Sequence, residues 1–553
     1  MVEDKQQTKK KKAGFLWRIF KWIGLGLLVL LLIMAVIYQA PWKVITLLAI
    51  VLAAGTLLPK PARKWFWLSA GCVVIALIIW IFLPNNDEGW RPYTFDEELA
   101  ALEAKYAIPD EENAAIIYNT LLENYEPNVF DVNYPNDERR SLPMREPWLS
   151  KDHPQIAERL QQHQTTITIL MKASKFEKCH FPIPLDTGRN NKWMKRLIVA
   201  RRSAWLLILA ANNDIAENRI DEALKKYIAT LQIGKHQRQQ PAMIDSLTGI
   251  GIQSYAIKQI QRYVITSDAT AEHLKIIEES LAKIKHDWSR DFQKDLEHKK
   301  LLSKRLLGWF YEINPKGKIR LNRNPWAEWI DSCKEQYEKK QMEEQQIREQ
   351  LKPIPYEYLT YWQKKTIRVQ TLLRWFILPS NPKKAGKVID NIFEKYYAMA
   401  KPDFDWKKQP KQTPITAITS VSIWPNFNQR RTIERLADIS ENFYILYHIV
   451  HDGYLRYVSN LKGCQISIAL RHYRNKNGHW PQTLDRIKLW VAEDVLTDPQ
   501  NNGLFVYKLT DDGFTLYSKG KNNIDEAGSK IDGADDWPIW PRQIPQANKK
   551  KSM

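Results

Sequence analysis

Apolar and polar positions divide the chain into an apolar start and a long, mostly polar remainder. Three apolar runs, 22–40, 44–58 and 65–83, lie within the first 84 residues. A helix rises about 1.5 Å per residue and must cross about 30 Å of hydrocarbon, so a span needs roughly 20 residues. The first and third runs come near that length, whereas the second is short. The pattern predicts three transmembrane helices in residues 1–84.

Basic residues around these runs predict how the segment is oriented. Lysines at 9–12 precede the first run, and basic residues at 60–64 separate the second from the third, whereas only Lys43 lies between the first and second. Because Lys and Arg are enriched on the cytoplasmic side of membranes, the N-terminus is expected inside. We therefore expect a multi-pass protein of the cell membrane with a large extracytoplasmic C-terminal region. A signal peptide is the alternative for the first run, but no small-residue cleavage site is evident.

The region that follows is expected to be mainly α-helical. From Asp96 to about Val458, apolar residues recur at spacings of three and four, which predicts helices. One predicted pair covers 220–236 and 242–264. It resembles the paired helices of tetratricopeptide-like arrays, although their period of about 34 residues is absent. Residues 85–428 are therefore expected to form an extended multi-helix soluble region, with a tetratricopeptide-like array as one form of it.

Two glycines lie inside the second helix of that pair. Glycine in a helix interior costs about 1 kcal/mol relative to alanine unless the missing side chain has a benefit. For Gly249 and Gly251 the expected benefit is close helix packing, and a ligand site is the alternative.

Residues 287–350 are highly charged. Their opposite charges fall at i,i+4 spacing, which is typical of solvated helices. We expect exposed helices here, with partner contacts as the alternative.

The C-terminal segment, residues 429–553, has a different pattern. A long helical pattern begins near Arg430 and stops at Asn477-Gly478, which is a helix C-terminal signal. Two alternating runs, 504–509 and 514–518, then flank the turn sequence TDDG, which predicts a β-hairpin. The segment is expected to form a long helix and a small α+β module.

The order of motifs in residues 463–541 carries a resemblance to a known family. ALRHYRNKNGHWPQTLDRI is followed by DPQNNGLFVYKLTDDGFTLYSKGKNN and IDEAG. This resembles the C-terminal part of the major pseudopilin of type II secretion, in which a helix, a turn, a hairpin and Tyr-Ser-x-Gly precede an acidic loop. The match covers about 80 of 553 residues and does not include the family's N-terminal polymerising helix. The whole arrangement is similar to large bacterial membrane-anchored proteins.

The resemblance implies a structural calcium site, because the corresponding loop of the family binds calcium. Ca²⁺ takes about six to eight oxygen ligands, and the ion would order a loop whose like charges otherwise repel. A solvated acidic turn without an ion is the alternative. The candidate ligands are the oxygen-bearing residues Asn522, Asn523, Asp525, Asp532, Asp535 and Asp536.

Four common catalytic motifs, Walker A, HExxH, GxSxG and GxGxxG, are absent from the sequence. His448, His451 and Asp452 form an HxxHD pattern that places both imidazoles on one helix face, but no third metal ligand is identifiable, so packing histidines are the favoured interpretation. Cys179 and His180 are adjacent in sequence, which disfavours a catalytic pair. No catalytic residue is assigned.

Net charge changes the picture of partners. The chain carries +20, of which residues 1–84 contribute eleven Lys and Arg against two acidic residues, leaving +11 for the rest. Basic and acidic residues alternate along the soluble helices, which favours a solvated surface near anionic membrane lipid, and nucleic acid is not an expected partner.

Together these patterns predict a non-enzymatic extracytoplasmic scaffold or interaction protein that assists secretion or envelope assembly by contacting other envelope or secretion proteins. The alternative is an extracytoplasmic hydrolase with a nonstandard site in the helical region.

Overall fold

The computed structural model describes the chain in segments: Pro59 and residues 89–123, 142–183, 192–284, 287–308, 310–321, 381–401, 404–406, 442–511, 513–528 and 534–541. The three apolar runs expected to span the membrane lie outside these segments. Among the helices within them, none is long and apolar enough to cross a membrane. The described part is mainly helical, as expected, and carries two small three-stranded antiparallel sheets.

Contacts along the backbone group the chain into two compact units. The domain boundary expected between residues 428 and 429 lies outside the described segments. One of the two units contains described residues from before and after this boundary. The first unit comprises Met1–Asp96, Lys300–Glu394 and Lys411–Ser440, and the second comprises Glu97–Lys299, Lys395–Pro410 and Glu441–Met553.

The described elements follow one another in a long helical series. The helices are α4 (Asp96–Tyr106), α5 (Ala115–Glu123), α6 (Leu142–Arg145), α7 (Pro154–Gln162), α8 (Gln164–Ala173), α9 (Lys192–Ala216), α10 (Ile220–Arg238), α11 (Met243–Thr266), α12 (Ala271–Ala282), α13 (Trp288–Gly308), α16 (Pro382–Tyr397) and α18 (Asn442–Asn477). The strands are β1 (Arg91–Pro92), β2 (Tyr311–Ile313), β3 (Ile319–Leu321), β4 (Val506–Thr510), β5 (Gly513–Ser518) and β6 (Trp537–Trp540).

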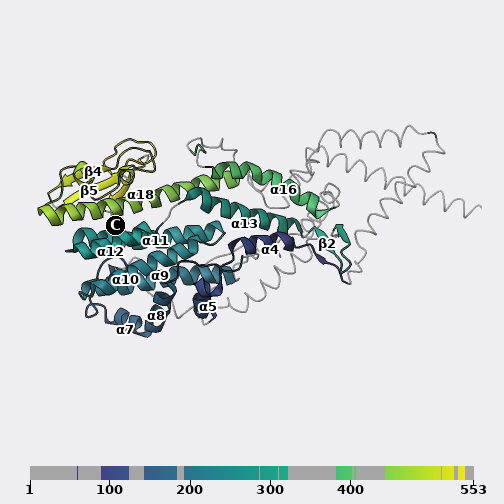
Figure 1. Ribbon diagram of the computed structural model, residues 1–553, viewed down its shortest axis with the longest axis horizontal. Helices are drawn as coiled ribbons and strands as arrows, with labels where there is room; N and C mark the ends of the chain where they lie inside the picture. Colours follow the sequence, from purple (N-terminus) through teal and green to yellow (C-terminus); the bar gives the residue numbers. More distant parts are fainter. Residues whose placement is uncertain are drawn as a thin grey trace, which may run out of the picture. The chain divides into compact units, whose positions relative to one another are not determined.

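In the second unit, consecutive helices pack in layers. Helices α9, α10 and α11 are joined by short connections and lie side by side, and α18 packs on α11 and α12 (Figure 1). The predicted pair is confirmed as α10 and α11. Helix α10 has Asp221 and Glu222 in its first turn and Lys235 and Arg238 in its last, charges that complement the helix dipole.

A glycine contact brings α10 and α11 close together. A Cβ at Gly249 would lie 2.4 Å from the carbonyl oxygen of Gly234, and a Cβ at Gly234 would lie 2.8 Å from that of Gly249. The close-packing prediction is therefore confirmed for Gly249. It is wrong for Gly251, where a Cβ would meet nothing within 4 Å.

Helix α13 corrects the expectation of exposed charged helices in residues 287–350. Its Phe292, Asp295 and Leu296 are buried despite the charges around them. Asp295 accepts hydrogen bonds from the Met243 backbone N–H (2.6 Å) and the Tyr447 hydroxyl (2.7 Å). Charged residues of this helix therefore contact other helices instead of water, and their partners come from distant parts of the chain. Residues 322–350 of the same expectation lie outside the described segments.

The C-terminal part of the second unit confirms the predicted helix end and hairpin. Helix α18 ends at Asn477, and Gly478 follows with a left-handed φ of 81°. Strands β4 and β5 pair antiparallel from Val506↔Tyr517 to Thr510↔Gly513. Strand β6 adds to β5, which gives the sheet order β4-β5-β6.

The first unit contains the other sheet, of order β1-β2-β3 and antiparallel throughout. Helix α16 buries Ala385, Ile389 and Ile392 at helical spacing. Its Asp390 forms an ion pair with Lys304 at 3.0 Å.

Candidate metal centre

The acidic loop connects β5 to β6 and is closed by their pairing. Ser518 pairs with Trp537 and Tyr517 with Pro538. The loop therefore returns to its starting point, and acidic residues from its two ends meet. The structure describes residues 519–528 and 534–536 of this connection.

Three carboxylates converge in the loop. Ligand oxygens of Glu526, Asp535 and Asp536 all lie within 4.8 Å of one another, and they form the only group of three or more His, Cys, Asp or Glu residues of this kind in the described segments. Glu526 Oε2 accepts hydrogen bonds from the backbone N–H groups of Asp535 (2.8 Å) and Asp536 (3.2 Å). Asp536 Oδ2 accepts from those of Glu526 (3.0 Å) and Gly528 (2.7 Å). These bonds fix the carboxylates in place.

Two carboxylate oxygens in this group are buried without a partner. Asp535 Oδ1 and Asp536 Oδ1 accept no hydrogen bond, and Asp536 is only 2% exposed. No Lys, Arg or His of the described segments forms an ion pair with any of the three carboxylates, and Lys521 pairs with Asp452 instead. Burial, together with the charges of Glu526 and Asp525, raises the pKa of Asp536. Within the described segments, the negative charge of this group is therefore not neutralised by any basic side chain.

Gly520 makes room for this arrangement. It has a left-handed φ of 61°, and a Cβ there would lie 2.1 Å from Asp535 Oδ1. Any side chain at this position would displace the carboxylate.

The donor set fits a hard divalent cation. Carboxylate oxygens are the ligands that Ca²⁺ prefers, and the ion needs about six to eight of them, so the three side chains form one part of a coordination shell. The two unpartnered oxygens are the atoms available for coordination. The residues present therefore fit calcium, whose role here would be charge neutralisation and loop ordering.

The sequence-predicted ligands divide into those that the structure brings together and those that it does not. Asp535 and Asp536 are in the group, and Asp532 lies outside the described segments. Asp525 points elsewhere, since it accepts from the Tyr517 hydroxyl (2.6 Å) and pairs with Lys508 (3.2 Å).

The two predicted asparagine ligands have other roles. Asn522 Oδ1 accepts from the Ile524 backbone N–H (2.7 Å), and its amide donates to Glu526 Oε1 (2.8 Å). Asn523 adopts a left-handed φ of 58° in the turn.

Sequence reasoning missed Glu526. It is the neighbour of Asp525, and a pattern cannot tell which of two adjacent carboxylates in an irregular loop faces inward. The sequence signal for this residue is the acidic pair Asp525-Glu526, which comes directly before the turn residues Ala527-Gly528.

The HxxHD pattern on α18 is a packing feature. His451 stacks on Trp406 with ring centroids 4.3 Å apart and contacts Trp288 edge-on at 5.0 Å. Burial lowers its pKa to about 4, which favours the neutral ring. Asp452 pairs with Lys521.

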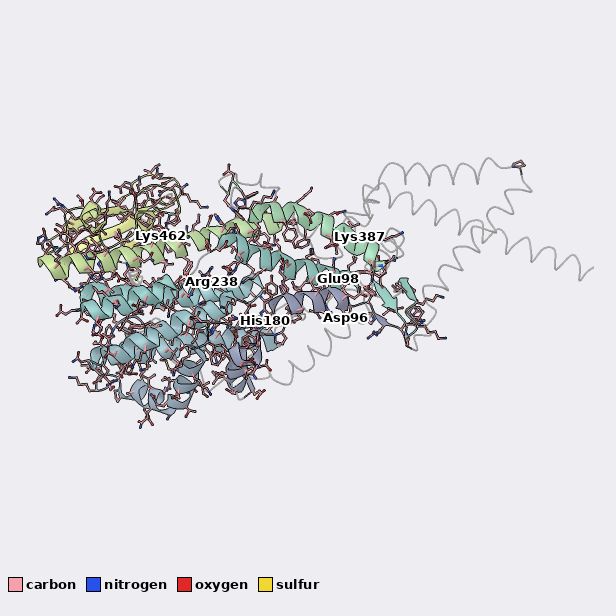
Figure 2. The ribbon with its side chains drawn as sticks, viewed as in Figure 1. Asp96, Glu98, His180, Arg238, Lys387 and Lys462 are labelled. Carbon is pink, nitrogen blue, oxygen red and sulfur yellow. The ribbon has the colours of Figure 1, made fainter. Side chains whose placement is uncertain are left out.

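Cys179 and His180 face different surroundings. The Cys179 thiol is buried, and burial raises its pKa, so the thiolate is disfavoured. His180, labelled in Figure 2, has its Nε2 3.0 Å from Glu103 Oε2. This geometry does not produce an activated nucleophile.

Comparisons with known proteins found no matching family model, no similar curated protein and no similar solved structure.

Proposed function

We propose that this chain is a membrane-anchored extracytoplasmic scaffold that displays a pseudopilin-like module to proteins of secretion or envelope assembly. In this proposal the apolar runs within residues 1–84 are the three membrane spans. The layered helices of the second unit are a tetratricopeptide-like support, and residues 463–541 are the displayed module.

The observation that carries the proposal is the way in which α18 joins the two parts. Toward the helical layers, Arg471 donates to the carbonyl oxygens of Val264 (2.6 Å) and Ile265 (3.1 Å) at the end of α11. Toward the sheet, the Trp537 indole N–H donates to Asn460 Oδ1 (3.0 Å). One helix therefore fixes the module to its support, as display requires.

The contact between α18 and β6 is close. A Cβ at Gly463 would lie 2.5 Å from Ile539 Cγ2, so the glycine lets the buried strand approach the helix. Lys462, labelled on α18 in Figure 2, donates to the carbonyl oxygens of Asp494 (2.7 Å) and Thr497 (3.0 Å). Such contacts hold the module in one orientation.

Site-specific photo-crosslinking in cells tests the display role. A photoreactive residue replaces Leu489 or Leu504, which are 88% and 66% exposed in the module. The matched control replaces Glu158, an exposed residue of α7 in the helical layers. We expect crosslinks to envelope or secretion proteins from the module positions and not from Glu158. An identical crosslinking pattern from all three positions would contradict display by the module.

We also propose that the group of Glu526, Asp535 and Asp536 holds a structural Ca²⁺. Tb³⁺ reports on such a site, because Trp537 adjoins Asp536 and can sensitise its luminescence. Full-length protein should show Tb³⁺ luminescence that Ca²⁺ displaces, and Ca²⁺ should raise the thermal stability of the module by mass action.

Three substitutions complete the calcium experiment. Glu526→Gln and Asp536→Asn should abolish the Ca²⁺-displaceable luminescence. Asp485→Asn, which removes an exposed acid of the same module paired with Lys488, should leave it unchanged. Luminescence that survives in both Glu526→Gln and Asp536→Asn would refute the site.

Among the described residues, neither Cys179 with His180 nor His448 with His451 has a geometry that favours the hydrolase alternative.

A further inference from the structure

A polar cleft lies in the second unit, away from the C-terminal module. Its volume is about 410 Å³, within the range of small-ligand sites. Its walls come from the end of α4 with the residues that follow it, from the extended residues 178–180, and from one face of α13. The lining residues are Lys105, Tyr106, Ile108, Lys178, Cys179, His180, Gln239, Arg290, Gln293, Lys294 and Glu297.

Helix α13 presents a polar stripe to the cleft. Arg290, Gln293, Lys294 and Glu297 lie at positions i, i+3, i+4 and i+7, and so share one face of the helix.

The rest of α13 is anchored, which makes this wall rigid. Asp291 forms an ion pair with Arg238 at 2.6 Å. Asp295 is held by the Met243 backbone and the Tyr447 hydroxyl.

Positive charge dominates the lining. Four Lys and Arg side chains face a single carboxylate, Glu297, which is already engaged by Lys105 at 2.6 Å and by the Tyr106 hydroxyl at 2.8 Å. Lys178 is paired with Glu112, outside the lining. Neither Arg290 nor Lys294 has a carboxylate partner among the lining residues.

Lys294 is the most informative of these residues. It is only 8% exposed, yet the structure gives its ammonium no hydrogen bond to the described residues, and its ion-pair contact, Asp291 Oδ1, is 4.0 Å away. The ammonium reaches the cleft while most of the side chain is enclosed, and this burial lowers the pKa of Lys294. An anion in the cleft would supply the missing partner.

Arg290 lies one helical turn from Lys294 and is exposed at the cleft. No ion pair or side-chain hydrogen bond joins its guanidinium to another described residue. A guanidinium can hold an oxyanion through two parallel hydrogen bonds, and an ammonium adds a point charge.

A second cleft, of about 420 Å³, shares Gln239 and Arg290 with the first. There Lys235 pairs with Glu177 and Arg238 with Asp291, and the remaining basic side chain besides Arg290 is the exposed Lys283. Only the first cleft adds a basic side chain that is mostly buried, Lys294, and this points to the first cleft as the anion site.

We propose that the first cleft binds the oxyanion group of a small ligand, a phosphate or a carboxylate, between Arg290 and Lys294. Lys105 and Lys178, whose side chains are about half exposed, attract the anion at the rim. Tyr106 and Ile108 provide an apolar wall for the rest of the ligand.

Thermal unfolding of the full-length protein in detergent tests the proposal. The probes are inorganic phosphate and succinate, each compared with sodium chloride at equal ionic strength. We expect a saturable rise in Tm with at least one oxyanion. Saturation by phosphate, by succinate or by both supports the proposal and identifies the group recognised.

Substitutions separate specific binding from general charge effects. Lys294→Met should raise the Tm of the ligand-free protein, because it removes a poorly paired buried charge, and should abolish the oxyanion-dependent rise. Arg290→Gln, at an exposed position that folding tolerates, should weaken binding about 10- to 100-fold. Lys275→Met, an equal charge loss at an exposed position of α12, should change neither property.

Two results would overturn the proposal. One is the absence of a saturable rise in Tm with either oxyanion beyond that with sodium chloride. The other is an oxyanion-dependent rise that persists undiminished in both Lys294→Met and Arg290→Gln.

Discussion

Replacing Gly249 by alanine should destabilise the contact between α10 and α11, although alanine is the better helix former. The new Cβ would lie 2.4 Å from the Gly234 carbonyl oxygen and 2.6 Å from Arg238 Cγ. The two helices must separate by about 1 Å to reach an ordinary contact distance. Arg238 would move with them, and it carries the ion pair to Asp291 and a hydrogen bond to the Tyr457 hydroxyl (3.2 Å).

The magnitude follows from two opposing effects. Overpacking a well-packed contact costs about 1–3 kcal/mol, and alanine returns about 1 kcal/mol of helix propensity. A net loss of up to about 2 kcal/mol remains in the free energy of unfolding. For a unit of more than 300 residues, a loss of this size lowers Tm by up to roughly 3 °C.

A matched control lies two residues along the same helix. A Cβ at Gly251 would meet nothing within 4 Å, so Gly251→Ala should gain up to about 1 kcal/mol. Thermal unfolding of both variants gives the comparison, and hydrogen exchange should show faster exchange in α10 and α11 of Gly249→Ala alone. A gain in stability for Gly249→Ala as large as that for Gly251→Ala would refute the close-contact explanation.

Three further changes test other parts of the structure. Burial raises the pKa of Asp295 from 3.8 to about 6, so the protonated carboxyl stabilises the folded state below about pH 4. As pH rises toward 6, the free energy of unfolding should fall by about 3 kcal/mol. Asp295→Asn should remove this fall, and Tm profiles of the two proteins that stay parallel from pH 4 to 6.5 would argue against it. Gly463→Val should loosen β6 from α18, because its side chain would overlap Ile539, and near-ultraviolet circular dichroism should lose tryptophan signal; an unchanged spectrum would count against this contact. Cys179 should resist maleimide at pH 8 until the protein unfolds, since its thiol is buried and its pKa is raised, and labelling at the rate of a free thiol would show otherwise.

Local signals explain which elements could be predicted from the sequence. The hairpin of β4 and β5 follows from alternating residues around a tight turn, and the end of α18 follows from Asn477-Gly478. Both signals lie within a few residues of the feature that they specify, so no knowledge of distant partners is needed.

Distant partners explain what could not be predicted. Asp295 is buried because Met243 and Tyr447, 52 and 152 residues away, satisfy its carboxylate. Lys294 lines a cleft whose other walls come from residues near 105 and 180. A charge pattern is the same for a solvated helix and for one that pairs its charges across an interior, so only the packed structure distinguishes them.

The acidic loop shows the same limit on a smaller scale. The resemblance predicts a calcium site in this loop, and in the structure Asp535 and Asp536 lie in one acidic group there. The third carboxylate is Glu526 and not its neighbour Asp525, because irregular backbone sets the direction of each side chain.

The location of the region after residue 84 is the most direct test of the proposed function. Intact spheroplasts that express the chain with a C-terminal epitope tag are treated with protease, and a cytoplasmic protein serves as the control for integrity. Three spans with the N-terminus inside predict loss of the tag while the cytoplasmic control stays intact. A tag that is protected until the cells are lysed would contradict an extracytoplasmic scaffold.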